Sequence, residues 1–297
     1  MGIKFTPQMT VPQFEKLFPT DDACKLYLQK RRWPKKVCCA RCGNEKVTPV
    51  STMPFHWQCT ECADKGGYRF SVLVGTVFEN TNVALKTWFK VIYLMLTSKK
   101  GISALQIHRM MGFGSYRTAW YLCHRVRAGL ADPQFRKLMG IVEVDETYIG
   151  GKNKNRHWDK KQPGTIAGKV LVAGAVSRKG NVVARVIENT DTDTLDSFVR
   201  QAVSEKVSLI VSDEHAAYRK LKDQFEHAFV RHSEGRYVDG VVHTQTIDGF
   251  WSLIKRGIMG AYHKVSRKYL PLYVAEFEFR YNNRNNPEIF EAAIARC

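Results

Sequence analysis

Two pairs of cysteines limit most strictly what the first part of this chain can fold into. Cys39 and Cys42 form one C-x-x-C motif, and Cys59 and Cys62 form a second one, with sixteen residues between the two motifs. Four thiolates at this spacing suit one tetrahedral Zn²⁺ ion that closes a small β-ribbon. Strand-forming runs follow the pairs, at residues 47–50, 56–58 and 68–74. We therefore expect a structural zinc ribbon, with a redox-active pair as the alternative.

The net charge indicates the class of partner. The chain has 46 lysines and arginines against 28 acidic residues, which gives a net charge of +18. Such an excess attracts a polyanion by neutralising phosphates and releasing counterions, so we expect double-stranded DNA as the partner. An anionic membrane is the weaker alternative, because no lone amphipathic basic helix stands out.

The N-terminus and the hydropathy pattern predict a location. No run of about 18 apolar residues is present, and residues 1–16 lack the apolar core of a signal peptide. We expect a cytoplasmic, nucleoid-associated protein that is neither secreted nor bound to a membrane. A reducing compartment also favours metal binding over disulfides for the clustered cysteines.

Four regions follow one another along the chain. We expect an N-terminal helical segment (1–34), the zinc ribbon (35–80), a helical DNA-binding region (81–135) and an α/β domain (136–297). Asp132-Pro133 suits the last linker, because proline disfavours helix at the residue before it. From Ile141 onwards strand-like runs alternate with helical ones, which is typical of an α/β fold.

The helical region contains a candidate helix-turn-helix motif. The first helix begins after Ser103, a favourable N-cap, and ends at Gly112. A second helix follows from Ser115 and carries Arg, Ser, Thr and Tyr side chains suited to DNA. We predict DNA contacts for its arginines Arg117, Arg125 and Arg127. The alternative is an ordinary helical hairpin with solvated arginines.

Two acids stand on strand-like segments. Asp145 lies inside the strand-like segment 141–151, on the same face as Glu143, although acids are disfavoured within strands. An exposed face on an edge strand is the plain interpretation. Asp213 ends the apolar segment 207–214, which follows a crossover helix and should lie parallel to the first strand. Asp213 would then lie at the carboxyl end of its strand, where α/β sheets bind ligands.

A third acid lies on a helix. Asp248 and Lys255 are seven residues apart in an amphipathic segment, so both can face one groove, and Gln245 shares the face of Asp248. Two strand acids and one helix acid can hold two divalent cations, for which Mg²⁺ or Mn²⁺ suits the oxygen ligands. Lys255 could then bind a DNA phosphate beside the ions. Taken singly, each acid could equally be a surface carboxylate.

Several motifs together resemble a known family. Residues 144–151, 212–215, 243–257 and 277–284 look like those of the DDE-type insertion-sequence transposases related to the eukaryotic Merlin elements. The resemblance covers nearly the whole chain, including the zinc ribbon. It implies an RNase H-like catalytic domain, a DDE triad with Mg²⁺, binding to terminal inverted repeats, cleavage of the element ends and strand transfer to a target.

The resemblance also implies roles for particular residues. Asp145 and Asp213 match the first two acids, whereas the family's asparagine and glutamate correspond to Gln245 and Asp248 here. We expect Asp248 to be the third ligand, assisted by Gln245 or His243. We also expect DNA contacts from basic residues around the site, namely Arg256, Lys264, Lys152 and Lys154.

Two other functions remain possible from the sequence. One is a DNA-binding regulator derived from a transposase that has lost catalysis, which the changed third position favours. The other is a nuclease of the RNase H or Holliday-junction type that cuts DNA without joining it. A transposase would act at least as a homodimer, because two element ends are processed together.

Overall fold

The computed structural model describes residues 9–62, 67–151, 157–160, 168–213, 216–230 and 242–297. The chain forms two compact units. Unit 1 comprises residues 1–130 and 285–297, and unit 2 comprises residues 131–284. The expected catalytic region ran to residue 297, but residues 285–297 belong to unit 1. Their apolar side chains Phe290 and Ile294 are buried there, in a core that the sequence pattern alone did not reveal.

Unit 1 is mainly helical. Thr20 caps the second helix by accepting a hydrogen bond from the backbone N–H of Ala23, as threonine commonly does at this position. Aromatic rings of Phe14, Phe18 and Phe290 pack at centroid distances of 5.2–6.0 Å and form much of the core. The helices are α1 (Val11–Leu17), α2 (Asp21–Arg32), α3 (Leu85–Thr97), α4 (Ala104–Met111), α5 (Tyr116–Leu130) and α9 (Ile289–Arg296).

A small antiparallel sheet follows α2. Its strands are β1 (Val47–Pro49), β2 (His56–Cys59) and β3 (Tyr68–Ser71), in the order β1-β2-β3. These are the strand-like runs that follow the cysteine pairs. The sheet holds Cys59 at the end of β2, where this side chain is fully buried.

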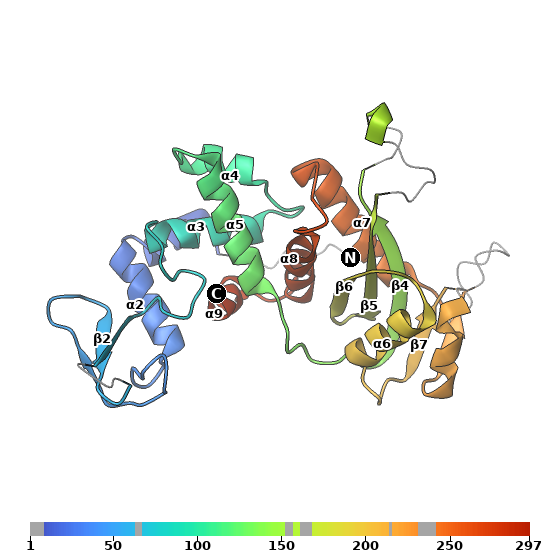
Figure 1. Ribbon diagram of the computed structural model, residues 1–297, viewed down its shortest axis with the longest axis horizontal. Helices are drawn as coiled ribbons and strands as arrows, with labels where there is room; N and C mark the ends of the chain where they lie inside the picture. The colour runs from blue at the N-terminus through green and yellow to red at the C-terminus, as the bar shows by residue number, and fades with distance from the viewer. Residues whose placement is uncertain (1–8, 63–66, 152–156, 161–167, 214–215, 231–241) are drawn as a thin grey trace. The chain divides into compact units, whose positions relative to one another are not determined.

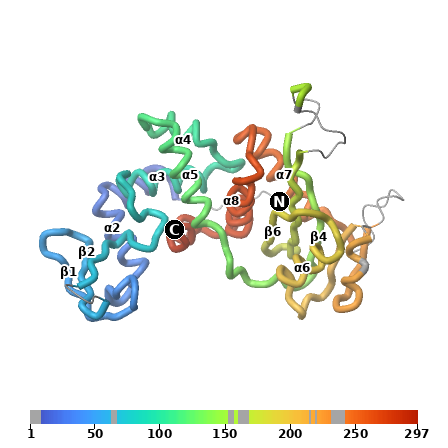
Figure 2. The backbone as a smooth tube through the Cα atoms, viewed as in Figure 1, coloured from blue at the N-terminus to red at the C-terminus, as the bar shows by residue number. Residues whose placement is uncertain are grey.

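The helix pair expected in unit 1 is present. Ser103 accepts a hydrogen bond from the N–H of Gln106 and caps α4, which ends at Gly112 with a φ of +65°, a conformation that suits glycine. The backbone then turns into α5 (Figure 2). Tyr116, Arg117 and Tyr121 are exposed on α5, so part of this helix is open to a ligand.

Unit 2 contains a five-stranded mixed sheet in the order β6-β5-β4-β7-β8. The central strand β4 pairs antiparallel with β5 on one side and parallel with β7 on the other. The parallel pairing confirms the arrangement predicted from the crossover helix. The strands are β4 (Ile141–Ile149), β5 (Val170–Ser177), β6 (Val182–Ile187), β7 (Leu209–Ser212) and β8 (His227–Phe229).

Helices cover both faces of this sheet (Figure 1). On one face Val142 and Val144 pack with apolar residues of the crossover helix α6, and on the other Val172 and Val176 pack with α7 and α8. The helical segments are α6 (Thr192–Ala202), α7 (Gln245–Gly257) and α8 (Leu270–Asn282), with short η2 (Trp158–Lys160), η3 (Ala216–Asp223) and η5 (Ile258–Tyr262). None of the helices in the described part of the chain is long and apolar enough to span a membrane.

Candidate active site

Asp145 and Asp213 lie at the same level of two neighbouring strands. In the parallel pair β4–β7 the last registered partners are Glu143 and Val211, and each aspartate stands two residues further along its strand. Residues in register on adjacent strands project to the same face of a sheet. The two carboxyl groups therefore share one face, at the point where β7 ends and β4 continues.

The surroundings of Asp145 disfavour its charge. Burial raises the pKa of Asp145 to about 6, and the nearby negative charges of Asp213 and Asp248 raise it as well. A hydrogen bond from the Trp251 side chain acts in the opposite direction. Asp248 precedes Trp251 by three residues on the helix Gln245–Gly257, and this tryptophan donates to Asp145, so the helix lies on the face of β4 that carries Asp145.

Glu146 adds a further carboxylate on the opposite face of β4. Burial raises its pKa to about 7, a hydrogen bond with Tyr218 lowers it, and the charges of Asp213 and Asp145 raise it. Repulsion among these acids costs folding free energy unless cations neutralise it. The carboxylate oxygens of Asp145, Asp213 and Asp248 are the kind of ligand that divalent Mg²⁺ or Mn²⁺ prefers.

Asp248 approaches from the helix α7. It lies in the first turn, is exposed, and accepts a hydrogen bond of 3.4 Å from the Thr244 hydroxyl. Lys255 lies two turns further along the same helix and is also exposed. Gln245 is the first residue of α7 and is exposed as well.

Glu143 has a role that the sequence did not suggest. Its carboxylate is fully buried and accepts hydrogen bonds from the backbone N–H groups of Thr246 (2.7 Å) and Ile247 (3.0 Å) in the first turn of α7. Arg178 pairs with it at 2.7 Å. An anion is favourable at a helix N-terminus, so Glu143 fastens α7 to the strand that carries Asp145.

The plain interpretation of the first acid strand was wrong. That interpretation predicted an edge strand with one exposed face. In the structure β4 lies between β5 and β7, and the side chains of Glu143 and Thr147 on that face are buried. His243 lies 3.4 Å from the Glu143 carboxylate through Nδ1, so it faces this structural acid. Assistance from His243 or Gln245 to a metal ion stays a prediction.

The three acids are not drawn together as tightly as the cysteines. Within the described ranges, the group of three or more possible ligands whose donor atoms lie within 4.8 Å of one another consists of the four cysteines. Carboxylates that hold two cations about 4 Å apart lie further from one another than the ligands of a single ion. Carboxylates without a bound cation also repel one another. The chemistry of the acids fits divalent cations, and their roles remain predictions.

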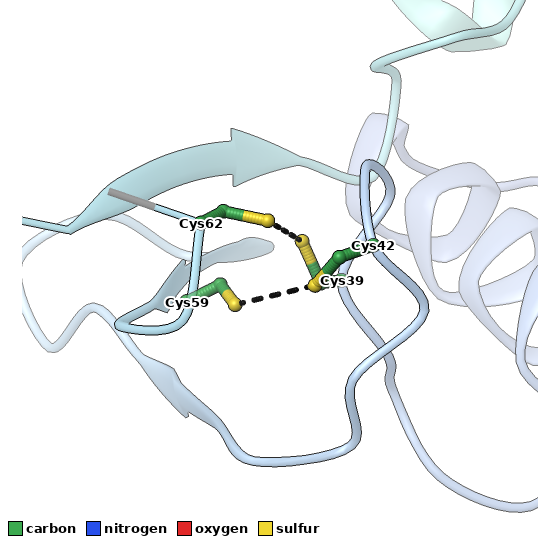
Figure 3. Close-up of side chains that lie close together, drawn as sticks. All are labelled: Cys39, Cys42, Cys59 and Cys62. Atoms are coloured by element: carbon green, nitrogen blue, oxygen red, sulfur yellow. Dashed lines mark hydrogen bonds between the residues drawn. The ribbon is translucent and has the colours of Figure 1, made fainter. Parts of the chain in front are cut away.

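The cysteine cluster has the dimensions of a zinc site. Sγ of Cys39 lies 3.6 Å from Sγ of Cys62, and Sγ of Cys42 lies 3.8 Å from Sγ of Cys59 (Figure 3). Four sulfurs about 2.3 Å from a tetrahedral Zn²⁺ ion would be separated by about 3.8 Å. Four thiolates leave no open coordination position, so the ion would have a structural role. Cys38 is not a member of this group.

The predicted DNA contacts have different outcomes. Arg127 is 0% exposed, so the prediction for this residue was wrong, because it faces the core side of α5 and DNA cannot reach it. Arg125 is half-buried, donates to the carbonyl oxygen of Glu79 and lies over the Trp88 ring. The exposed predicted residues are Arg117, Arg256 and Lys264, whereas Lys152 and Lys154 lie outside the described residues.

His227 gives unit 2 a predictable pH dependence. Its Nε2 lies 2.9 Å from the hydroxyl of Ser212, next to Asp213, and burial lowers its pKa to about 4, with the Lys222 charge adding to this effect. Unfolded histidine titrates near 6.5. Between these two values the unfolded chain binds more protons at this residue than the folded chain does, so His227 contributes a fall in the free energy of unfolding as the pH drops from about 6.5 to about 4. The raised pKa values of Asp145 and Glu146 contribute in the opposite direction.

Urea unfolding of the protein and of His227→Gln at pH 7, 5.5 and 4.5 checks this dependence. As the pH drops from 7 to 4.5, the free energy of unfolding should fall less, or rise more, in the variant than in the wild type. His263→Gln, at an exposed histidine of unit 2, should keep the wild-type dependence. Equal slopes for the wild type and His227→Gln would contradict the prediction.

Comparison with known proteins identifies both parts of the chain. Residues 137–282 match the family model of the ISXO2-like transposase domain, and residues 19–65 match that of the transposase zinc-ribbon domain. The chain therefore carries a transposase domain of this family and a transposase zinc ribbon. The expected zinc ribbon and the resemblance to insertion-sequence transposases are thereby confirmed.

A relative extends the match over most of the transposase. An uncharacterized protein in transposable element ISH50 of Halobacterium salinarum is 28% identical over 279 residues, covering 89% of this chain and 92% of that protein. The sheet order with β4 between an antiparallel and a parallel neighbour agrees with an RNase H-like domain. The predicted fold class, an RNase H-like α/β domain after a zinc ribbon, is confirmed.

Solved structures resemble the transposase more distantly. The HTLV-2 integrase catalytic core domain, in complex with magnesium, is 16% identical with a TM-score of 0.27 and covers 48% of this chain and 83% of that chain. The pre-cleavage Mos1 transpososome is 13% identical with a TM-score of 0.28, over 69% and 77% of the two chains. Likenesses this weak carry no argument about this transposase.

Proposed function

We propose that this transposase cleaves the ends of an insertion element and joins them to target DNA, with two divalent cations held by Asp145, Asp213 and Asp248. The observation that carries the proposal is the common level of Asp145 and Asp213 on adjacent parallel strands, with Asp248 influencing Asp145 from α7. A transposase domain accounts for the reaction class.

The reaction consists of two phosphoryl transfers. In the first, a water oxygen attacks the phosphodiester at the element end, the bond from phosphorus to the 3′-oxygen breaks, and that oxygen takes a proton as a 3′-hydroxyl. In the second, this hydroxyl attacks a target phosphodiester, which forms a new bond to phosphorus and releases a target 3′-hydroxyl. Bound Mg²⁺ or Mn²⁺ supplies charge neutralisation and activation of the attacking oxygen.

The side chains of unit 2 supply position and charge. Asp145 is held on a central strand and Asp213 follows the end of β7, so both carboxylates have backbone supports that are fixed by sheet pairing. Lys255 is exposed two turns from Asp248 on α7, where its ammonium group can pair with a DNA phosphate. Arg256 and Lys264 add positive charge after it.

Unit 1 would recognise the element ends. The exposed Arg117 and Tyr121 on α5 and the zinc ribbon offer surfaces for DNA, in line with the net charge of +18. Because the reaction processes two ends together, we infer a homodimer or larger assembly on DNA.

Arg117→Ala should weaken binding to element-end DNA and reduce the slope of log K against log salt concentration by about one. The physical reason is that one phosphate contact with its released counterion is lost. Fluorescence anisotropy at several salt concentrations measures both quantities. Lys16→Ala, which removes one exposed charge from α1, should leave the slope unchanged. An unchanged slope for Arg117→Ala would remove this residue from the interface.

A strand-transfer assay with labelled element ends tests the proposed function. Cleavage followed by joining to a target supports the transposase. Cleavage without joining would indicate a nuclease instead, and binding without cleavage would indicate a regulator derived from a transposase. Either of these results would overturn the proposal.

A further inference from the structure

Trp251 contacts the first acid directly. The indole Nε1–H of this residue on α7 donates a hydrogen bond of 2.9 Å to Oδ2 of Asp145 on β4. Trp251 is 3% exposed, so the ring has little freedom to move. An indole has one N–H donor and no acceptor, and this bond therefore fixes one oxygen of Asp145 in a single orientation.

Gly174 makes room for this ring. It is the partner of Asp145 in the register of β4 and β5. A Cβ atom at position 174 would lie 2.5 Å from Cη2 and 2.6 Å from Cζ2 of Trp251, which is too close for any side chain. Glycine inside a strand is unfavourable, and it often marks the close approach of another group. Here that group is the indole that reaches Asp145.

The ring is also held from the helix side. Glu143 binds the first turn of α7, so the strand and the helix are joined both at the helix N-terminus and at Trp251. Asp248 lies between these two attachments on the same helix. Rotation of α7 would break the bonds to Glu143 and to Asp145 together, so the two predicted metal ligands Asp145 and Asp248 are positioned as one set.

Packing alone does not account for an indole at this position. Trp251 belongs to an apolar cluster with Val172, Val176 and Phe250, and a phenylalanine at position 251 could also pack in this cluster. The N–H group is the part of the ring that an apolar core does not use. Buried tryptophan usually finds a partner for this group, and here the partner is a carboxylate of the proposed metal site.

We propose that Trp251 is a positioning residue for divalent cations: its N–H holds Oδ2 of Asp145, with Oδ1 offered to the metal, and Gly174 is required to seat the ring. This inference depends on the proposed role of Asp145 as a metal ligand. Removing a side chain that forms a hydrogen bond to a metal ligand typically weakens metal binding by about 10- to 100-fold.

The test measures Mn²⁺ binding to the full-length, zinc-loaded protein by electron paramagnetic resonance, together with end cleavage as a function of Mn²⁺ concentration. Trp251→Phe removes the donor and keeps an aromatic ring. It should weaken Mn²⁺ binding about 10-fold and raise the Mn²⁺ concentration for half-maximal cleavage by a similar factor. Phe277→Leu, a change at a 0% exposed residue of the same apolar cluster on α8, controls for lost packing and should leave both values near wild type.

Gly174→Ala provides a second variant. In the wild-type background this substitution should displace the indole and weaken Mn²⁺ binding. In the Trp251→Phe background it should have little further effect, because the indole atoms Cη2 and Cζ2 that the new Cβ would meet are absent. Thermal melting followed by circular dichroism establishes that each variant is folded. Additive effects of the two substitutions would contradict the role assigned to Gly174.

Asp145→Asn distinguishes the proposed metal site from the positioning role of Trp251. If Asp145→Asn weakens Mn²⁺ binding and Trp251→Phe does not, the positioning role is wrong and the proposed metal site stands. If neither substitution weakens Mn²⁺ binding, the proposed site itself is wrong. Equal losses of Mn²⁺ affinity in Trp251→Phe and Phe277→Leu would show that Trp251 acts only through packing.

Discussion

Asp145→Asn should abolish end cleavage and strand transfer, with a loss of at least about 10³-fold, while binding to element-end DNA is retained. A metal ion stabilises the charge of the transition state by several kcal/mol, and about 1.4 kcal/mol corresponds to each factor of ten in rate. Asparagine keeps the size of the side chain but removes the negative charge that holds the cation. Single-turnover cleavage with excess protein and an anisotropy measurement of DNA binding give the two quantities.

Asp193→Asn is the matched control for this variant. It makes the same chemical change at an aspartate of α6 whose side chain is 90% exposed, so cleavage should stay near wild type. If Asp145→Asn cleaves at the wild-type rate, Asp145 is not a metal ligand and the proposed site is wrong. If it loses DNA binding as well, the defect is not specific to the chemistry.

Cys42→Ser should release zinc and unfold the ribbon. Structural zinc sites contribute about 10–16 kcal/mol of binding free energy to small domains, and much of this is lost with one of four thiolates. Cys42 is exposed, so the substitution removes little packing and reports mainly on the metal. Mass spectrometry of bound metal should find about one zinc per wild-type chain and much less in the variant, with an early thermal transition for the ribbon.

The adjacent cysteine offers an unusually close control. Cys38 lies next to Cys39 but outside the four-sulfur group, so Cys38→Ser should keep its zinc and its melting behaviour. Zinc loss in Cys38→Ser would show that the ligand set is shifted by one residue. Zinc retained in Cys42→Ser would contradict the four-cysteine site.

The proposed third acid, Asp248, limits how far the site can reach from α7. Asp248 has a side chain one methylene shorter than a glutamate would have at this position. In this structure Asp248 is exposed and its carboxylate accepts from Thr244. The attachment of α7 through Glu143 and Trp251 decides how near this short side chain comes to the strand acids.

Several features of this transposase could be predicted from local sequence. Two C-x-x-C pairs and the strand runs beside them predicted the four zinc ligands, because the spacing within each motif brings its own sulfurs together. Ser103 and Gly112 predicted the limits of α4 through their capping chemistry. The crossover before the segment that ends near Asp213 predicted a parallel neighbour for the first acid strand, which brings Asp145 and Asp213 to the same level of adjacent strands.

Other features were decided only by tertiary structure. Arg127 looked like a DNA contact, but the side of α5 on which it lies is buried in unit 1. Residues 285–297 appeared to continue the catalytic domain, yet they pack into unit 1. Helical spacing places a side chain on a face, but the packing of that helix against others determines whether the face meets solvent.

The sequence by itself thus determined the four-cysteine cluster, the order of the elements and the neighbouring strands that carry Asp145 and precede Asp213, since each depends on spacing within a segment or on the handedness of a crossover. Tertiary structure decided how the acids are supported. Glu143 and Asp145 meet α7 across more than 100 residues of chain, and Gly174 leaves the space that Trp251 fills. Such contacts depend on how a helix packs onto a sheet, which no local spacing specifies.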